Sequence, residues 1–169
     1  MFEGIQTPVV GEDVTSVKGR GEWLPIRLSV DSVSELVLTQ AQIAECIHSH
    51  GRPVLLHSCG NLCQVMDDII EDVKIDAKHS FEDTFLPVTE AKRKYGDRIA
   101  ILGGIDVDFL CRASEEQVRE YVRKVIDICG PGGGYALGTG NSVANYIPVQ
   151  NYLAMLDEGR HYGVYPLAG

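Results

Sequence analysis

The pattern of apolar and polar positions repeats itself along most of the chain. After Gly51, a short apolar run is followed four times by a stretch whose apolar residues recur at helical spacing; the runs lie at 54–57, 73–77, 99–102 and 135–137. Each run is apolar on both faces, which is typical of a parallel strand covered by helices. The pattern therefore predicts the order βαβαβαβα.

The apolar positions between the runs predict which helix faces are buried. The first expected helix has its apolar stripe at Leu62, Val65, Met66, Ile69 and Ile70, and the second spans 84–95. The third begins with a capping box at Ser114 and Gln117 and has its stripe at Val118, Val122, Val125, Ile126 and Cys129. The fourth has its stripe at Val149, Tyr152, Leu153 and Leu156 and ends near His161. Right-handed crossovers then allow an open doubly wound sheet or half of a (β/α)₈ barrel.

The start of the chain follows another pattern. Residues 1–30 show no sustained period and are predicted to be an irregular segment with one strand near 26–30, followed by a helix at about 32–50. We therefore expect a short amino-terminal segment, 1–30, and one α/β domain, 31–169.

Composition narrows the class of protein. The 169 residues, 44% hydrophobic and 23% charged, suit one globular domain. The net charge of -9 argues against binding of nucleic acid or of an anionic membrane surface. The start, Met1-Phe2-Glu3-Gly4, lacks an export signal, and no apolar run is long enough to cross a membrane. These features predict a cytoplasmic protein. Five cysteines, an odd number, favour thiols over a disulfide framework.

Polar residues follow each predicted strand. His57, Cys59 and Asn61 follow the first, His79 the second, Asp106 the third, and Thr139, Asn141 and Ser142 the fourth. The carboxyl ends of parallel strands are where α/β enzymes hold their chemistry. His57 and Cys59 are two residues apart, so their side chains should point to one side and close on a zinc ion with an open coordination place. The alternative is a strand end with a packed thiol.

The other polar groups each have two interpretations. Asp106 is the candidate acid or base and His79 can reach the same site, but a solvated carboxylate and a surface histidine are the alternatives. Thr139, Asn141, Ser142 and Asn61 can bind substrate or close their turns. Residues 130–134, Gly-Pro-Gly-Gly-Gly, precede a strand and are predicted to be a helix stop rather than a phosphate loop.

Several of these motifs stand in a familiar order. His-Ser-Cys-Gly-Asn at 57–61, Leu-Gly-Gly-Ile-Asp at 102–106, Gly-Pro-Gly-Gly-Gly-Tyr at 130–135, and Pro148 followed by Asn-Tyr-Leu-Ala-Met at 151–155 resemble the carboxy-terminal half of the uroporphyrinogen decarboxylase superfamily. The resemblance implies the last four units of a (β/α)₈ TIM barrel of roughly twice this length, preceded by a helix.

The resemblance also implies two kinds of chemistry. Zinc-dependent methyltransferases of the superfamily, which move methyl groups between corrinoid proteins and thiols, match this chain at His57 and Cys59. Their third ligand is a cysteine where this chain has Thr139, which is a poor zinc ligand. Cys63 could substitute in principle, but packing of its thiol on the following helix is the favoured interpretation. The decarboxylases place a histidine at that turn, which Thr139 does not match either.

From these observations we expect a methyltransferase with zinc bound by His57 and Cys59, a small-molecule substrate, and a corrinoid carried by a partner protein. A carboxy-lyase of porphyrin biosynthesis is the first alternative. The second is a non-catalytic half-barrel that assembles as a homo-oligomer or with a complementing half-barrel, because an incomplete barrel leaves strand edges open.

Overall fold

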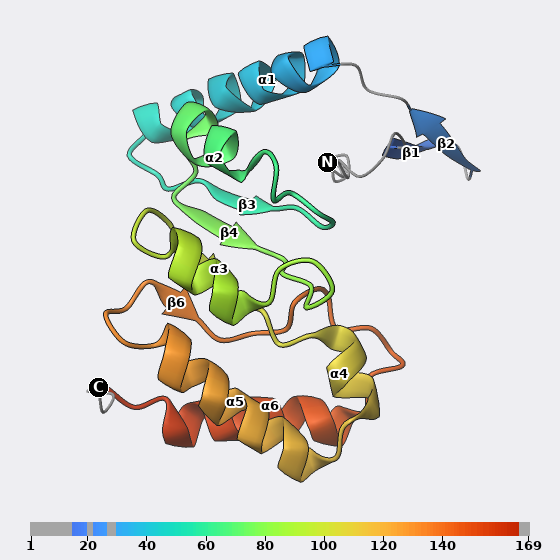
Figure 1. The fold of residues 1–169 in the computed structure, drawn as a ribbon, viewed down its shortest axis with the longest axis vertical. Helices are drawn as coiled ribbons and strands as arrows, with labels where there is room; N and C mark the ends of the chain where they lie inside the picture. Colours follow the sequence, from blue (N-terminus) through green and yellow to red (C-terminus); the bar gives the residue numbers. More distant parts are fainter. Residues whose placement is uncertain (1–14, 20–21, 27–29, 166–169) are drawn as a thin grey trace. The chain divides into compact units, whose positions relative to one another are not determined.

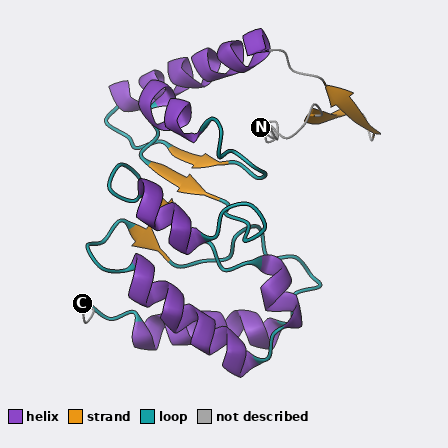
Figure 2. Ribbon diagram, in the orientation of Figure 1, coloured by secondary structure: helices purple, strands orange, loops and turns teal. Residues whose placement is uncertain are grey.

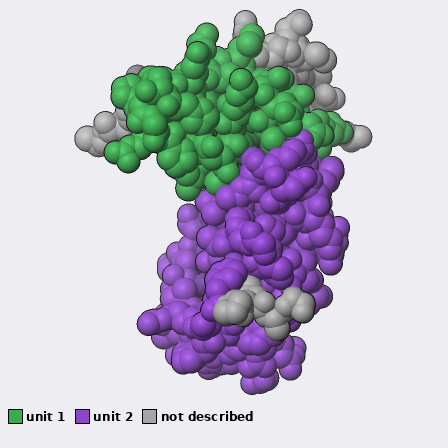
Figure 3. Space-filling model, turned by 90° about the vertical axis from the view of Figure 1, so that its left-hand side faces the viewer, with its two compact units in different colours: residues 1–77 green, residues 78–169 purple. Residues whose placement is uncertain are grey.

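A computed structural model of the chain describes residues 15–19, 22–26 and 30–165, with side chains from residue 37 onward. Strands and helices alternate along it (Figures 1 and 2). The chain divides into two compact units, Met1–Ala77 and Lys78–Gly169 (Figure 3). Within the described residues, no helix is long and apolar enough to cross a membrane.

Four parallel strands alternate with helices, as the apolar runs predict. They are β3 (Leu55–His57), β4 (Ala77–His79), β5 (Ala100–Leu102) and β6 (Tyr135–Ala136), ordered β3-β4-β5-β6. The register of β5 and β6 pairs Ile101 with Tyr135 and Leu102 with Ala136. This α/β arrangement is consistent with part of a TIM-barrel-like fold.

The secondary structure at the start of the first unit differs from the prediction. Two antiparallel strands, β1 (Thr15–Gly19) and β2 (Glu22–Ile26), pair where the sequence predicts mainly loop. The strand expected at 26–30 is not formed in its described part, because Ile26 ends β2 and Val30 begins helix α1 (Val30–Ser49); residues 27–29 lie outside the described residues. The helix predicted at 32–50 is confirmed.

A π-helix replaces part of the second predicted strand. After α2 (Met66–Asp68), the chain continues as η1 (Ile69–Val73), which buries Ile69, Ile70 and Val73. Lys74 follows with φ 62°, a left-handed conformation that ends the helix. The strand predicted at 73–77 is therefore wrong over most of its length, because only Ala77 belongs to β4.

Asp76 fixes this turn to the rest of the first unit. Its Oδ2 accepts hydrogen bonds from the Val54 N–H, at 2.7 Å, and from His48 Nε2 on α1, at 2.8 Å. The His48 hydrogen bond, followed by the one from Val54, holds the pKa of the Asp76 carboxyl below its usual value.

In the second unit, α3 (Val88–Tyr95) is shorter than the predicted helix at 84–95. Pro87 immediately precedes α3 and has an extended ψ of 142°. A residue before proline is disfavoured in the helical conformation, so a helix cannot readily run through residue 86 into Pro87. Residues 80–87 instead form the connection between β4 and α3.

Helix α5 (Glu115–Cys129) matches its prediction closely. Both bonds of the capping box are present, from the Gln117 N–H to Ser114 Oγ and from the Ser114 N–H to Gln117 Oε1. The predicted stripe is buried: Val118, Val122, Val125, Ile126 and Cys129. The preceding helix α4 (Val107–Arg112) was not predicted.

Helix α6 (Val149–Tyr162) forms where expected but buries another face. Its buried residues are Asn151, Ala154, Met155 and Glu158. Val149, Leu153 and Leu156, predicted to be buried, are instead 62%, 55% and 39% exposed. The predicted face is wrong because α6 packs on both α4 and α5 through a mixed polar and apolar surface. Asn151 donates to the carbonyl oxygens of Leu110 on α4 and of Ala113 just after it.

Candidate functional site

The His57 and Cys59 side chains converge at the end of β3. His57 Nε2 lies 3.6 Å from Cys59 Sγ, so the prediction that the two side chains share one side is confirmed. The histidine is exposed and the cysteine half-buried, while Ser58 between them is 2% exposed. An imidazole and a thiol are thus presented together where they remain accessible.

That separation suits a shared zinc ion. Zinc–sulfur and zinc–nitrogen bonds of about 2.3 Å and 2.0–2.1 Å at a tetrahedral angle place the two donor atoms about 3.6 Å apart. The donor set is also the one that zinc prefers. His57 and Cys59 therefore fit two zinc ligands in both chemistry and spacing.

The loop after Cys59 does not add a third ligand. Asn61 Oδ1 accepts a hydrogen bond from the Cys63 N–H at 3.1 Å, which shapes the turn into the next helical segment. Among the residues that the structure describes, no three His, Cys, Asp or Glu side chains gather closely enough to hold a metal ion. Cys63 joins no such group in the described structure, and its role as a ligand stays a prediction.

In the second unit, His79 and Thr139 are brought together at the ends of β4 and β6. His79 Nε2 lies 3.1 Å from the Thr139 carbonyl oxygen. Gly103 permits this approach: its φ is +79°, and a Cβ there would lie 2.5 Å from that oxygen and 2.7 Å from His79 Nε2. The imidazole is thus held by the backbone of the turn after β6.

Thr139 and Asn141 use polar atoms to close that turn. The Thr139 hydroxyl donates to the Asn141 carbonyl oxygen at 2.5 Å, and Asn141 Oδ1 accepts from the Ser142 N–H at 2.7 Å. These contacts account for the polar residues of 139–142 as turn-forming groups, while their predicted role in substrate binding stays a prediction.

Asp106 has a structural task that the sequence did not indicate. It precedes α4 as its N-cap: Oδ1 accepts from the Phe109 N–H at 3.1 Å, and Oδ2 accepts from the Asp83 N–H at 3.2 Å. Both oxygens are therefore engaged with backbone, and Asp106 ties the connection at 80–87 to α4. Its predicted role as acid or base stays a prediction.

Asp83 is a chemically distinctive residue that sequence reasoning missed. Removal of water by surrounding protein atoms raises the pKa of its carboxyl, and the charge of Asp106 adds to this, while the hydrogen bond from the Tyr121 hydroxyl, at 3.0 Å, acts in the opposite direction. Burial also raises the pKa of Tyr121. No sequence signal distinguishes Asp83 from the other loop acids, because its partner is 38 residues away.

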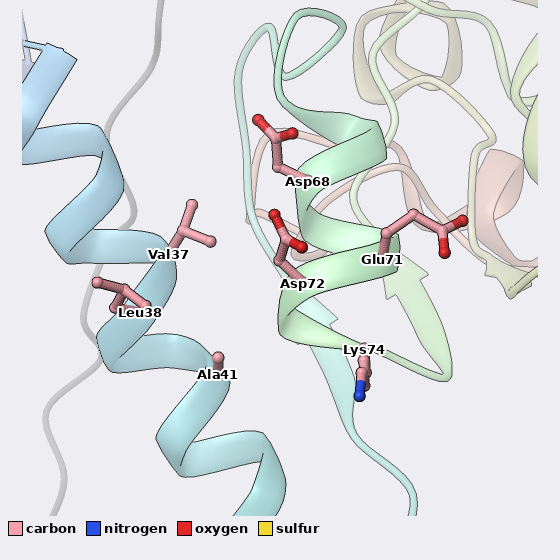
Figure 4. A pocket seen from close by; sticks show the side chains of 7 residues that line it. All are labelled: Val37, Leu38, Ala41, Asp68, Glu71, Asp72 and Lys74. Carbon is pink, nitrogen blue, oxygen red and sulfur yellow. The ribbon is translucent and has the colours of Figure 1, made fainter.

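The first unit also contains a groove whose lining residues differ from all the candidate residues described above. It has a volume of about 840 Å³ and runs between α1 and the α2–η1 segment, lined by Val37, Leu38, Ala41, Asp68, Glu71, Asp72 and Lys74 (Figure 4). None of the predicted site residues lines it. Three carboxylates and Lys74 line one side of it, and apolar residues of α1 line the other.

The alternating strands and helices define an α/β protein, and their arrangement is consistent with part of a TIM-barrel-like fold. A family model described as uroporphyrinogen decarboxylase (URO-D) matches residues 28–162. The chain belongs to this family.

Similar proteins carry two different names. The uroporphyrinogen decarboxylase of Thioalkalivibrio sulfidiphilus is 36% identical over 77 residues, which cover 46% of this chain and 22% of that protein. That of Cupriavidus necator is 34% identical over 74 residues, covering 42% and 20%. A solved methyltransferase from Methanosarcina mazei matches with a TM-score of 0.62 and 18% identity, covering 82% of this chain and 39% of that chain. The last likeness concerns the fold alone.

Proposed function

We propose that the chain is a methyltransferase-type member of the family, in which His57 and Cys59 hold zinc and a thiol accepts a methyl group from a corrinoid on a partner protein. The observation that carries the proposal is the separation of 3.6 Å between His57 Nε2 and Cys59 Sγ. When bound, zinc would keep an acceptor thiol as the more nucleophilic thiolate.

The residues of the chain have defined tasks in this proposal. His57 binds through Nε2, which must carry no proton, and Cys59 binds as a thiolate, so zinc uptake releases a proton and zinc affinity rises with pH. Zinc held by these two side chains would keep places open for substrate and water, as catalytic zinc sites do and closed four-ligand structural sites do not.

Zinc binding by single-site variants tests this proposal. Wild-type protein dialysed against zinc should bind one ion per chain, and His57→Ala or Cys59→Ala should weaken binding at least about tenfold. Cys46→Ala is the matched control, because Cys46 is an exposed thiol on α1 and should be dispensable. Metal content should be measured together with thiol-dependent demethylation of methylcobalamin. Undiminished zinc in a His57→Ala, Cys59→Ala double variant would contradict the proposal.

The names of the curated relatives favour a second candidate, a carboxy-lyase acting on a porphyrinogen. This activity would release carbon dioxide from uroporphyrinogen in the presence of a metal chelator and would be insensitive to Cys59→Ala. The two candidates therefore give opposite results with the chelator.

A further inference from the structure

The connection between β4 and α3 is held firmly at both ends. At its start, the Lys78 ammonium donates to the Ser80 carbonyl oxygen at 2.5 Å and lies 4.3 Å from the centre of the Phe81 ring. Ser80 and Phe81 are each only 3% exposed. At the other end, Val88 opens α3 and is fully buried. Any movement of the connection is therefore expected in its middle.

That middle, residues 82–86, is a local turn at the surface, which we name the flap. Within it, the N–H groups of Phe85 and Leu86 donate to the Glu82 carbonyl oxygen, both at 3.0 Å. Asp83 and Phe85 are exposed, Phe85 by 44%. Exposed segments with little buried apolar surface are those that open most readily in a folded protein. The contacts that close the flap on its neighbours therefore decide how often it opens.

Asp83 joins the flap to two helices of the second unit. Its Oδ2 accepts a hydrogen bond from the Tyr121 hydroxyl on α5, at 3.0 Å, and its N–H donates to Oδ2 of Asp106, the N-cap of α4, at 3.2 Å. The Tyr121 ring packs on Phe109 of α4, with ring centroids 4.7 Å apart. We name Asp83 and these two hydrogen bonds the latch. Its other half is thus carried by the packed pair α4 and α5.

Two carboxyl groups, those of Asp83 and Asp106, interact at the latch. Loss of water around Asp83 is the main cause that raises the pKa of its carboxyl, and the negative charge of Asp106 adds to it; the Tyr121 hydrogen bond and the positive charge of Lys124 act in the opposite direction. The closed latch therefore binds the Asp83 proton more tightly than an open flap, in which water surrounds this carboxyl. Protonation favours closure, and this stabilisation is lost as the pH rises through the raised pKa.

We propose that the flap is a pH-sensitive device: protonated Asp83 latches it to α4 and α5, and ionisation of Asp83 releases it. A Cβ on Gly140 would lie 2.4 Å from the Phe81 carbonyl oxygen, so the residue that precedes the flap packs against the turn after β6. The flap thus moves beside the carboxyl ends of β4 and β6, the end of a sheet at which α/β enzymes bind substrates. Neither His57 nor Cys59 belongs to the latch, so the device is independent of the proposed metal chemistry.

Residue-resolved amide exchange of the full chain tests the device, with each rate divided by its intrinsic rate at the same pH. The Asp83 amide reports closure directly, because it donates to Asp106 Oδ2. Its protection should fall several-fold from pH 4 to pH 7 as Asp83 ionises. The Phe109 amide donates to Asp106 Oδ1, so it is the control for changes at Asp106 and should not show this fall. Protection of the Asp83 amide that stays constant or rises over this range would overturn the proposal.

Asp83→Asn separates this device from an ordinary hydrogen bond. Asparagine resembles the protonated carboxyl, because it is uncharged and its oxygen can still accept from Tyr121. We expect Asp83→Asn to raise the amide protection at residue 83 several-fold at pH 7 and to remove its pH dependence. Asp97→Asn, in the exposed turn after α3, removes the same charge and should leave the flap unchanged. If Asp83→Asn instead lowers the protection at pH 7, the ionised carboxylate is the stronger latch and the proposal is overturned.

Discussion

At the scale of single residues, two positions carry the proposed chemistry, and a third, Gly103, allows two strand ends to approach each other. His57 and Cys59 could be paired from the sequence because strand geometry alone sets the direction of residues i and i+2. The contact between His79 and the Thr139 carbonyl could not, because it joins residues 60 apart and depends on a close approach at Gly103.

Gly103 offers a test of that close approach. Gly103→Ala should destabilise the fold more than Gly133→Ala, although φ is nearly the same, +79° and +77°. An alanine in the left-handed region costs about 1–2 kcal/mol at either position. At Gly103 the Cβ also meets His79 and Thr139, which adds ~1–3 kcal/mol, whereas nothing lies within 4 Å at Gly133. Urea unfolding of both variants measures the difference; equal losses would show that the backbone around Gly103 relaxes freely.

At the scale of elements, patterns that depend on neighbours in sequence were reliable and patterns that depend on packing partners were not. The capping box of α5 and its buried stripe follow from local spacing. The buried face of α6 does not, because Asn151 and Glu158 are polar residues that become buried only through partners on α4, on the segment that follows it, and on α5. The π-helix η1 likewise includes Val73, the first residue of the strand predicted at 73–77.

The ion pairs between α5 and α6 predict a pH dependence of stability. Arg123 Nε bonds to Glu158 Oε1 at 2.6 Å and Arg119 Nη1 to Glu158 Oε2 at 3.1 Å, which lowers the pKa of Glu158 below 4.5, with Arg123 as the main cause. Because the pKa of Glu158 is lower in the folded state, the unfolded state takes up this proton at a higher pH than the folded state does. The ion pairs therefore stabilise the fold above pH 4.5, and this stabilisation is lost as the pH falls through the lowered pKa.

Glu158→Gln should therefore lower the melting temperature at neutral pH and flatten its decline below pH 4.5. Asp157→Asn is the matched control and should have a smaller effect, because its side chain is 49% exposed and water screens its pair with Arg119. Thermal unfolding from pH 7 to pH 3 compares the variants. A Glu158→Gln profile that is parallel to wild type would contradict the assignment.

At the scale of the whole molecule, the sequence predicted the parallel α/β arrangement because buried strands and amphipathic helices have different periods. Family membership follows from the match over residues 28–162. The reaction was harder to predict. The resemblance implies a cysteine for the methyltransferases or a histidine for the decarboxylases at the turn after the last strand, and this chain has Thr139 there. The arrangement around His57 and Cys59 therefore carries the functional argument.

X-ray absorption at the zinc edge of the zinc-loaded protein tests that argument most directly. The account predicts one sulfur at about 2.3 Å and one imidazole nitrogen at about 2.0–2.1 Å, with lighter atoms completing the shell, and loss of the sulfur contribution in Cys59→Ala but not in Cys46→Ala. A shell composed only of oxygen and nitrogen in the wild-type protein would contradict it.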